Sequence, residues 1–263
     1  MEESVVEQLF VWEEINKTIS ILKVEEPILY DYILGFLILP GDFKSGLSSV
    51  LNYYLFSSVE SEFNLFYEII YKAIDSCPDI CRSAIADLLA FCDRDPASLS
   101  MLQTFIFAKG YIAIQAYRVA HALWCSGNKY SAQMIQLKMS NIFSVDIHPA
   151  ARLGKGLFFD HATGVVIGET AVVEDNVSIL HEVTLGGTGK QKGARHPTIR
   201  EGALLCSGAK ILGNIEVGKG SKVGAGSVVL KDVPPSSTVV GIPAKVVGAL
   251  KFNPAFEMDQ HLI

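Results

Sequence analysis

The sequence has no long apolar stretch, no run of positive charge and no closely spaced cysteine pair. Its 22 lysines and arginines are outnumbered by 28 acidic residues, which gives a net charge of −6 at pH 7. A chain of this charge has little attraction for nucleic acid or an anionic membrane. The longest apolar run, at residues 33–39, is far shorter than the roughly 20 residues of a membrane span. We therefore expect neither nucleic acid nor a membrane as a partner.

Signals for secretion and for disulfide formation are also missing. The first residues, MEESVVEQ, are acidic where a signal peptide would be basic. None of the five cysteines forms a CxxC pair, and Cys77 and Cys81 have no nearby histidine or second pair to complete a metal site. These features predict reduced thiols in a cytoplasmic protein.

In the second half of the sequence, apolar residues recur at every sixth position. Neither a helix, with a period of 3.6, nor a strand, with a period of 2, produces this spacing. A triangular parallel β-helix does, because each hexad supplies one short strand and one corner. The repeat residues, which we expect to point inward, are Ile147, Leu153, Phe159, Val165, Ala171, Val177, Val183, Ile199, Leu205, Ile211, Val217, Val223 and Val229.

The first half has helical periodicity instead. Apolar residues recur three and four apart, which predicts helices at 5–22, 47–56, 63–74, 80–91, 99–126 and 129–141. We expect a helical domain at 1–141, a β-helical domain at 142–248, and a tail at 249–263 that is mobile. The predicted fold class is α+β.

One excursion, at 184–198, interrupts the predicted solenoid. Val183 and Ile199 are sixteen residues apart, four more than two hexads, and the intervening LGGTGKQKGARHP is polar and basic. Repeat proteins often place function in such insertions. The excursion is not a nucleotide-binding P-loop, because Thr184 stands where the first glycine is required and Gln191 follows Lys190 in place of serine or threonine.

Histidine and carboxylate spacing suggests one catalytic pair. Asp146 precedes His161 by fifteen residues, close to one coil of eighteen, so the two could be neighbours on adjacent coils. A carboxylate that orients an imidazole can activate a hydroxyl nucleophile. Arg195 and His196 in the excursion are a candidate pair for a substrate carboxylate. His181 is left without a role.

A zinc site is the alternative for these histidines, because hexapeptide solenoids include the gamma-class carbonic anhydrases. That class uses a closely spaced histidine pair, which His161, His181 and His196 do not provide. We therefore expect no metal.

Longer motifs resemble the serine acetyltransferase family. They are VDIHPAARLGKGLFFDHATGVVIGETAVV, VTLGGTGK, RHPTIREGA, GAKILGNIEVGKGSKVGAGSVVL and GIPAKVVG, with DRDPAS and KGYIAIQAYRVAHALW upstream. Other hexapeptide acyltransferases share the period but not this combination. The resemblance implies a left-handed β-helix and transfer of an acetyl group from acetyl-CoA to the hydroxyl of L-serine, the first step of cysteine synthesis.

The resemblance also implies residue roles. His161 would be the general base and Asp146 would orient it. The amino group of serine would be bound by Asp95 and Asp160, its carboxylate by Arg195 and His196, with Glu169 assisting. CoA would lie along the corners of the coils, at Gly187, Ser207, Lys222, Ala225 and Lys245. Cys206 departs from the small residue that many relatives carry beside this groove.

Further partners follow from the same resemblance. Members form trimers through the solenoid and hexamers through the helical domain, with active sites between neighbouring solenoids. L-cysteine is a feedback inhibitor of many members, and a terminal isoleucine, here Ile263, inserts into O-acetylserine sulfhydrylase.

Two other functions are compatible with the solenoid. An acetyltransferase acting on a sugar is disfavoured by Asp95 and Asp160, since a neutral sugar needs no paired carboxylates. A scaffold that only binds the sulfhydrylase is disfavoured by the Asp146 and His161 pair.

Overall fold

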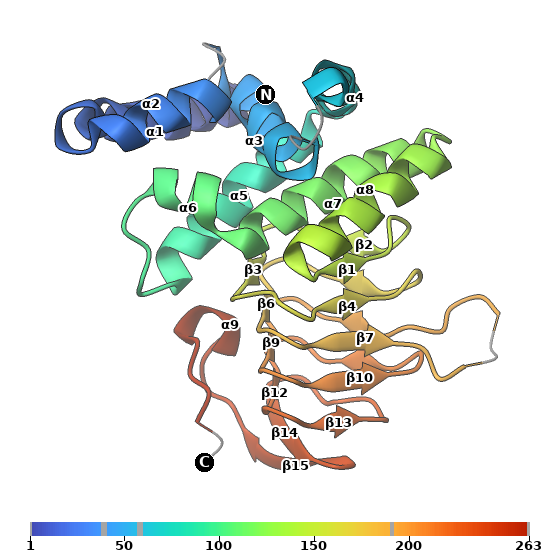
Figure 1. Cartoon of the computed structure of the whole chain (residues 1–263). Coiled ribbons are helices and arrows are strands. Elements are labelled where there is room, and N and C mark those ends of the chain that lie inside the picture. Colours follow the sequence, from blue (N-terminus) through green and yellow to red (C-terminus); the bar gives the residue numbers. More distant parts are fainter. Residues whose placement is uncertain (1, 38–40, 57–59, 190–191, 262–263) are drawn as a thin grey trace.

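The computed structural model describes residues 2–37, 41–56, 60–189 and 192–261 of the 263-residue chain. A layered group of helices stands on one end of a prism of short strands (Figure 1). The helices are α1 (Glu2–Glu25), α2 (Pro27–Leu37), α3 (Phe43–Phe56), α4 (Glu60–Ser76), α5 (Asp79–Arg94), α6 (Met101–Phe107), α7 (Lys109–Cys125) and α8 (Lys129–Phe143). None of the helices in these ranges is long and apolar enough to cross a membrane.

The helix expected at 99–126 is divided into α6 and α7. Ala108, between them, has extended backbone angles (φ −74°, ψ 99°) and ends one helix while beginning the next. Tertiary packing explains the break. A Cβ at Gly110 would lie 2.0 Å from the carbonyl oxygen of Phe159, so only glycine allows the first turn of α7 to sit on the solenoid. Apolar periodicity continues through the break and could not reveal it.

The strands form the three faces of the prism, and within each face they pair in parallel one coil apart. The first face contains β1 (Asp146–Ile147), β4 (Val166–Ile167), β7 (Thr184–Gly186), β10 (Lys210–Leu212) and β13 (Val228–Val229). The second contains β2 (Arg152–Leu153), β5 (Val172–Val173), β8 (Thr198–Ile199) and β11 (Glu216–Val217). The third contains β3 (Phe158–Phe159), β6 (Ser178–Ile179), β9 (Leu204–Leu205), β12 (Lys222–Val223), β14 (Ser237–Gly241) and the antiparallel β15 (Ala244–Ala249). The predicted α+β fold with a left-handed hexapeptide β-helix is confirmed.

The strand register corrects the predicted repeat. Phe159 pairs with Ile179, twenty residues on, which is two more than three hexads. Ile179 pairs with Leu205, twenty-six residues on, which is eight more. The solenoid therefore has two insertions rather than one, a short one after Phe159 and a long one that leaves β7 and projects from the prism (Figure 1).

The prediction of which residue in each hexad stacks on the next coil was wrong for several hexads, because each hexad buries two side chains. Val165, Val177 and Val183 are fully buried, but they lie two residues before the strand positions that stack on Ile147 and Phe159. Both buried positions carry small or aliphatic residues, so the six-residue period alone cannot distinguish them. The excursion predicted to be four residues long has eight extra residues for the same reason.

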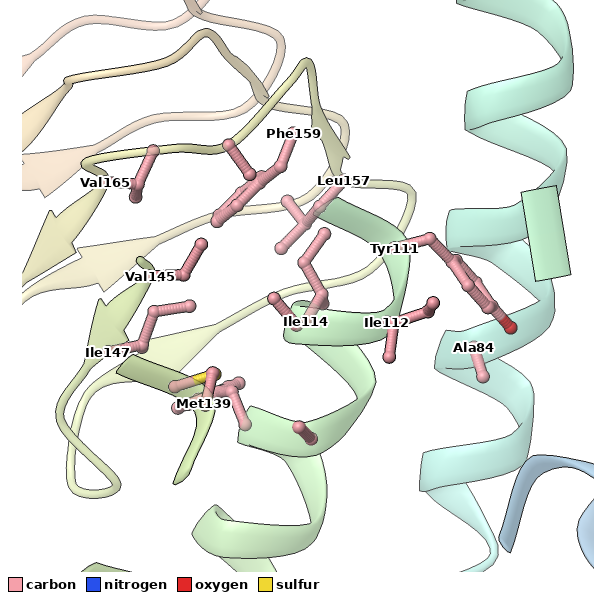
Figure 2. Close-up of a cluster of buried hydrophobic side chains, with 14 of the residues drawn as sticks. Ala84, Tyr111, Ile112, Ile114, Met139, Val145, Ile147, Leu157, Phe159 and Val165 are labelled. Carbon is pink, nitrogen blue, oxygen red and sulfur yellow. The ribbon is translucent and has the colours of Figure 1, made fainter. Parts of the chain in front are cut away.

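The helices and the first coil share one core. Figure 2 shows side chains of α7 and α8 meeting those of the first coil, and the labelled residues of these segments include Ile112, Ile114, Met139, Val145, Ile147, Leu157, Phe159 and Val165. A fully buried Asp87 on α5 joins the two parts as well. Its carboxylate accepts hydrogen bonds from Arg118 of α7 and from the backbone amide of Leu157 at 2.9 Å. The helices are therefore packed firmly against the coil that carries His161.

Tyr117 provides a test of this junction. Its hydroxyl, on a side chain that is 1% exposed, donates to the carbonyl of Ala151 at 2.5 Å. We expect Tyr117→Phe to lower the free energy of unfolding by about 1–3 kcal/mol, because a buried carbonyl loses its donor. Chemical denaturation measures the change. Tyr130→Phe is the control, since that side chain is 90% exposed and the substitution should leave stability unchanged.

The tail, which we expected to be mobile, packs on the third face. Its short helix α9 (Pro254–Glu257) lies beside α5, with the Phe256 ring 4.4 Å from the guanidinium of Arg94. Lys222 is 2% exposed and donates to the carbonyls of Asp259, at 3.0 Å, and His261, at 2.5 Å. Because the buried ammonium of Lys222 needs hydrogen-bond acceptors, its bonds to these carbonyls hold the tail against the third face. Ile263 lies outside the described residues, as do Lys190 and Gln191 of the excursion.

Candidate active site

A pocket of about 520 Å³ lies where the helices meet the first corner of the solenoid. Its lining includes Asp95, Asp160 and His161, so the structure brings Asp95 to two predicted site residues that lie 65 and 66 positions later in the sequence. Asp95 reaches the pocket because α5 ends at Arg94 and the following Pro96 keeps Asp95 extended (φ −94°, ψ 106°). Its carboxylate accepts from the amide of Ala97 at 2.9 Å, which fixes the turn.

His161 lies on the two-residue insertion. Both His161 and Ala162 adopt left-handed backbone angles, with φ of 55° and 57°. The amide of Gly164 donates to Ser144 and that of Glu182 to Thr163, each at 2.7 Å, so the turn is bonded to the segments before and after it. The imidazole is 75% exposed and its Nε2 is 3.8 Å from the Asp160 carboxylate, beyond hydrogen-bonding distance. The insertion thus projects His161 into the pocket with a nitrogen free to act.

Asp146 is not bonded to His161 in the described part of the chain. Its carboxylate accepts from Nε2 of Gln136 on α8 at 2.7 Å. Its backbone amide donates to Val165, which places it one coil from the end of the His161 turn. The structure brings the two residues to adjacent coils, as the spacing suggested, without joining their side chains.

Below His161, one corner of the prism forms a continuous backbone ladder. Gly208 donates to the carbonyl of His181 at 2.9 Å, and Gly226 donates to that of Ser207 at 2.8 Å. Ser207 and the exposed Ala225 therefore lie in one column beneath His161, where an extended ligand could run. Both are predicted CoA contacts.

The other predicted CoA residues lie elsewhere. Lys222 is buried under the tail and Lys245 is exposed on β15. Gly187 belongs to the excursion, and a Cβ at this position would lie 3.5 Å from Nε2 of His196. In this conformation the ammonium of Lys222 is committed to tail carbonyls and does not face solvent.

His181 is a candidate that sequence reasoning missed. Its ring lies one coil below His161, with the ring centroids 5.9 Å apart. Its Nδ1 is buried and has no hydrogen-bond partner. A buried polar atom without a partner is costly and often marks a functional group. Spacing of twenty residues could have revealed the pair, had the two-residue insertion been recognised.

A second cluster occupies the next corner of the same coil. Arg195 donates to the carboxylate of Glu169 at 2.5 Å, and this hydrogen bond lowers the pKa of Glu169. The backbone amide of Thr170 donates to Nδ1 of His196 at 3.2 Å, so the ring proton of the neutral imidazole is on Nε2. A Cβ at Gly168 would lie 2.1 Å from that nitrogen, so only glycine fits here. The cluster presents a guanidinium and an imidazole N–H, both suited to a carboxylate.

The pKa of His196 is lowered, first by burial and second by Arg195. The folded protein therefore keeps His196 neutral below about pH 6.5, where the unfolded chain takes up a proton. The stability that this difference supplies is present above that pH and is lost as the pH falls. We expect Tm to fall less between about pH 7 and 5 in His196→Gln than in wild type. A parallel fall in both proteins would contradict the assignment.

The two clusters lie at different corners of the solenoid within one chain. Gly164 ends the His161 turn and Gly168 begins the next corner, with β4 between them. Four residues of extended backbone span about 13 Å. The ammonium and carboxylate of an amino acid are only a few ångströms apart.

Comparison with known proteins identifies the family of this chain. A family model for the N-terminal part of serine acetyltransferase matches residues 11–116, and one for bacterial transferase hexapeptide repeats matches residues 196–231. The chain is 46% identical over 252 residues to the serine acetyltransferase of Salmonella typhimurium, covering 95% of this chain and 92% of that protein. The chain belongs to the serine acetyltransferase family.

Other members of the serine acetyltransferase family are similarly close. Serine acetyltransferase 4 of Arabidopsis thaliana is 48% identical, with 95% of this chain and 70% of that protein covered. A structure of a serine acetyltransferase in complex with cysteine has a TM-score of 0.93 at 44% identity, covering 97% and 100% of the two chains. The soybean serine acetyltransferase in complex with serine has a TM-score of 0.87 at 47% identity, covering 92% and 99%.

Among the described residues, no group of three or more histidine, cysteine, aspartate or glutamate side chains is arranged to hold a metal ion.

Proposed function

We propose that the chain is a serine O-acetyltransferase in which His161 is the general base. The observation that carries the residue assignment is the pocket that gathers Asp95, Asp160 and His161 from two separate parts of the chain. Two carboxylates beside one imidazole suit an acceptor that carries an ammonium group next to a hydroxyl. A neutral sugar hydroxyl would leave both carboxylates without a partner.

The carboxylate of serine is bound by the second cluster of a neighbouring copy. Arg195 and His196 supply a guanidinium and an Nε2–H donor, and Glu169 holds Arg195 in place. Because the two clusters of one chain lie at different corners, with β4 between them, we infer that the site is formed between copies. A closed trimer, the assembly implied by the resemblance, supplies both halves at every site.

The reaction is direct attack on the thioester. His161 removes the proton of the serine hydroxyl as its oxygen bonds to the acetyl carbonyl carbon. Asp146 leaves Gln136 and orients the imidazole during this step. The tetrahedral intermediate then expels the CoA thiolate, and the imidazolium of His161 returns the proton to sulfur. The products are O-acetylserine and CoA.

His181 is placed to stabilise the intermediate. It lies between His161 and Ser207 on the column that acetyl-CoA occupies, and its buried Nδ1 has no partner. If its ring rotates, a nitrogen can donate to the charge that develops on the thioester oxygen, and such stabilisation acts mainly in the transition state.

Acetyl-CoA is the co-substrate, and it runs down the corner column past Ser207 and Ala225. The exposed Lys245 is available for a phosphate, whereas Lys222 becomes available only when the tail moves. We place the protein in the cytoplasm, where its five free cysteines would stay reduced. Inhibition by L-cysteine, assembly into hexamers through the helical domain and binding of Ile263 to O-acetylserine sulfhydrylase are further parts of this proposal.

An acceptor panel tests the function. CoA release from acetyl-CoA is measured with L-serine, with ethanolamine, which lacks the carboxylate, and with 3-hydroxypropionate, which lacks the ammonium group. Only L-serine should support rapid release, because each analogue leaves one cluster without its partner. Equal rates with all three acceptors, or a preference for a sugar, would overturn the substrate assignment.

A further inference from the structure

The first turn of α7 reaches from the helical region to the corner that carries His161. Lys109, the first residue of α7, donates a short hydrogen bond from Nζ to Oγ1 of Thr163. Thr163 is two residues beyond His161, and both lysine and threonine line the pocket. The helical region therefore contacts the turn itself as well as the core beneath it.

This turn needs external support. Two successive non-glycine residues in the left-handed region cost on the order of 1–3 kcal/mol each and persist only where neighbouring structure holds them. Besides bonds within the turn, such as that from the Ala162 amide to Asp160, its backbone is bonded to Ser144 and Glu182, which precede and follow it in or beside the solenoid. Within the described ranges, Lys109 supplies the one side-chain hydrogen bond to this turn from the helices.

The position of Lys109 is fixed by its neighbour. Gly110 lies so close to the carbonyl of Phe159 that no Cβ fits, and Gly110 itself is buried. The backbone of α7 thus begins at a set distance from the end of β3, directly before the insertion. A lysine at this point can reach Thr163 without displacing the helix.

We propose that Lys109 is a positioning residue for His161, holding through Thr163 the left-handed turn that presents the imidazole to substrate. The inference rests on the proposed function of His161 as base. Through Lys109, the helical region would contribute to catalysis as well as to packing and assembly.

Charge in the pocket argues against direct binding of serine by Lys109. The ammonium of serine would sit between Asp95 and Asp160, and a second cation there would repel it. The lysine ammonium is instead directed at a neutral hydroxyl of the turn. Its effect should therefore appear in the chemical step more than in substrate binding.

Four variants test the proposal: Lys109→Met, Lys109→Arg, Thr163→Val and the Lys109→Met/Thr163→Val double variant. We expect Lys109→Met and Thr163→Val each to lower kcat by about 10- to 100-fold, since small misplacement of a catalytic group is costly. KM for serine should change by less than about threefold, and Lys109→Arg should restore most of kcat. The double variant should be no slower than either single one, because both remove the same bond.

Lys129→Met is the matched control. Lys129 is the first residue of α8, as Lys109 is of α7, but it stacks on Trp124 away from the pocket, so kcat should be unchanged. Thr163→Val tests the same bond from the other side should Lys109→Met fail to fold. Additive losses, a rise in KM alone, or wild-type rates in both single variants would overturn the inference. Failure of wild type to use serine would instead overturn the proposed function.

Discussion

His161→Ala is expected to lower kcat for serine acetylation by about 100- to 10,000-fold, the range that general base catalysis contributes. The substitution removes the imidazole that accepts the hydroxyl proton and later returns it to the CoA sulfur. Because the side chain is 75% exposed, its loss should leave Tm unchanged. Initial rates of CoA release with saturating L-serine and acetyl-CoA measure the effect.

His261→Ala is the control for this variant. His261 is also exposed, and the contact it makes with Lys222 uses its backbone carbonyl, which alanine retains. Its kcat should match that of wild type. A His161→Ala protein that retains most of its activity would show that another group removes the proton, and His181 would become the candidate.

Arg195→Ala should lower kcat/KM for serine by about 100-fold, because a charged hydrogen-bonding partner of the substrate carboxylate is lost. The loss should appear mainly as a higher KM for serine, while KM for acetyl-CoA changes little. The column of Ser207 and Ala225, which we propose for CoA, lies on the other corner of the prism. Titration of each substrate at a fixed concentration of the other separates the two effects.

Arg200→Ala is the matched control for Arg195. Arg200 is also bonded to glutamates, Glu174 and Glu216, but these lie on the second face of the solenoid, outside both clusters. Its removal should leave both KM values unchanged. A similar loss in both variants would indicate a general effect of charge on the surface of the solenoid.

The sequence predicted the fold because the hexad repeat is a direct consequence of one strand and one corner per turn of the coil. It did not predict the register, because two buried positions in every hexad carry the same kinds of residue, as Ile147 and Val165 illustrate. The insertion that projects His161 was therefore hidden in a continuous period. The break at Ala108 was hidden for a similar reason.

The sequence predicted which residues line the pocket, but it did not predict how the chain brings them together. Spacing suggested that Asp146 and His161 are neighbours, and resemblance supplied Asp95, but only the packing of α5 against the first coil explains why Asp95 meets Asp160. The buried Lys222 could not be predicted, since its partners are backbone carbonyls of a tail that carries no recognisable pattern.

The arrangement of one site between two copies is tested most directly by mixing His161→Ala and Arg195→Ala chains. Each protein alone lacks one half of every site, whereas a mixed trimer contains sites in which His161 of one chain meets Arg195 of its neighbour. If equal amounts assemble at random, about a quarter of the sites are complete, so activity at serine concentrations well below KM should return to about a quarter of the wild-type value. Activity in the mixture no higher than that of the separate variants would contradict the shared site.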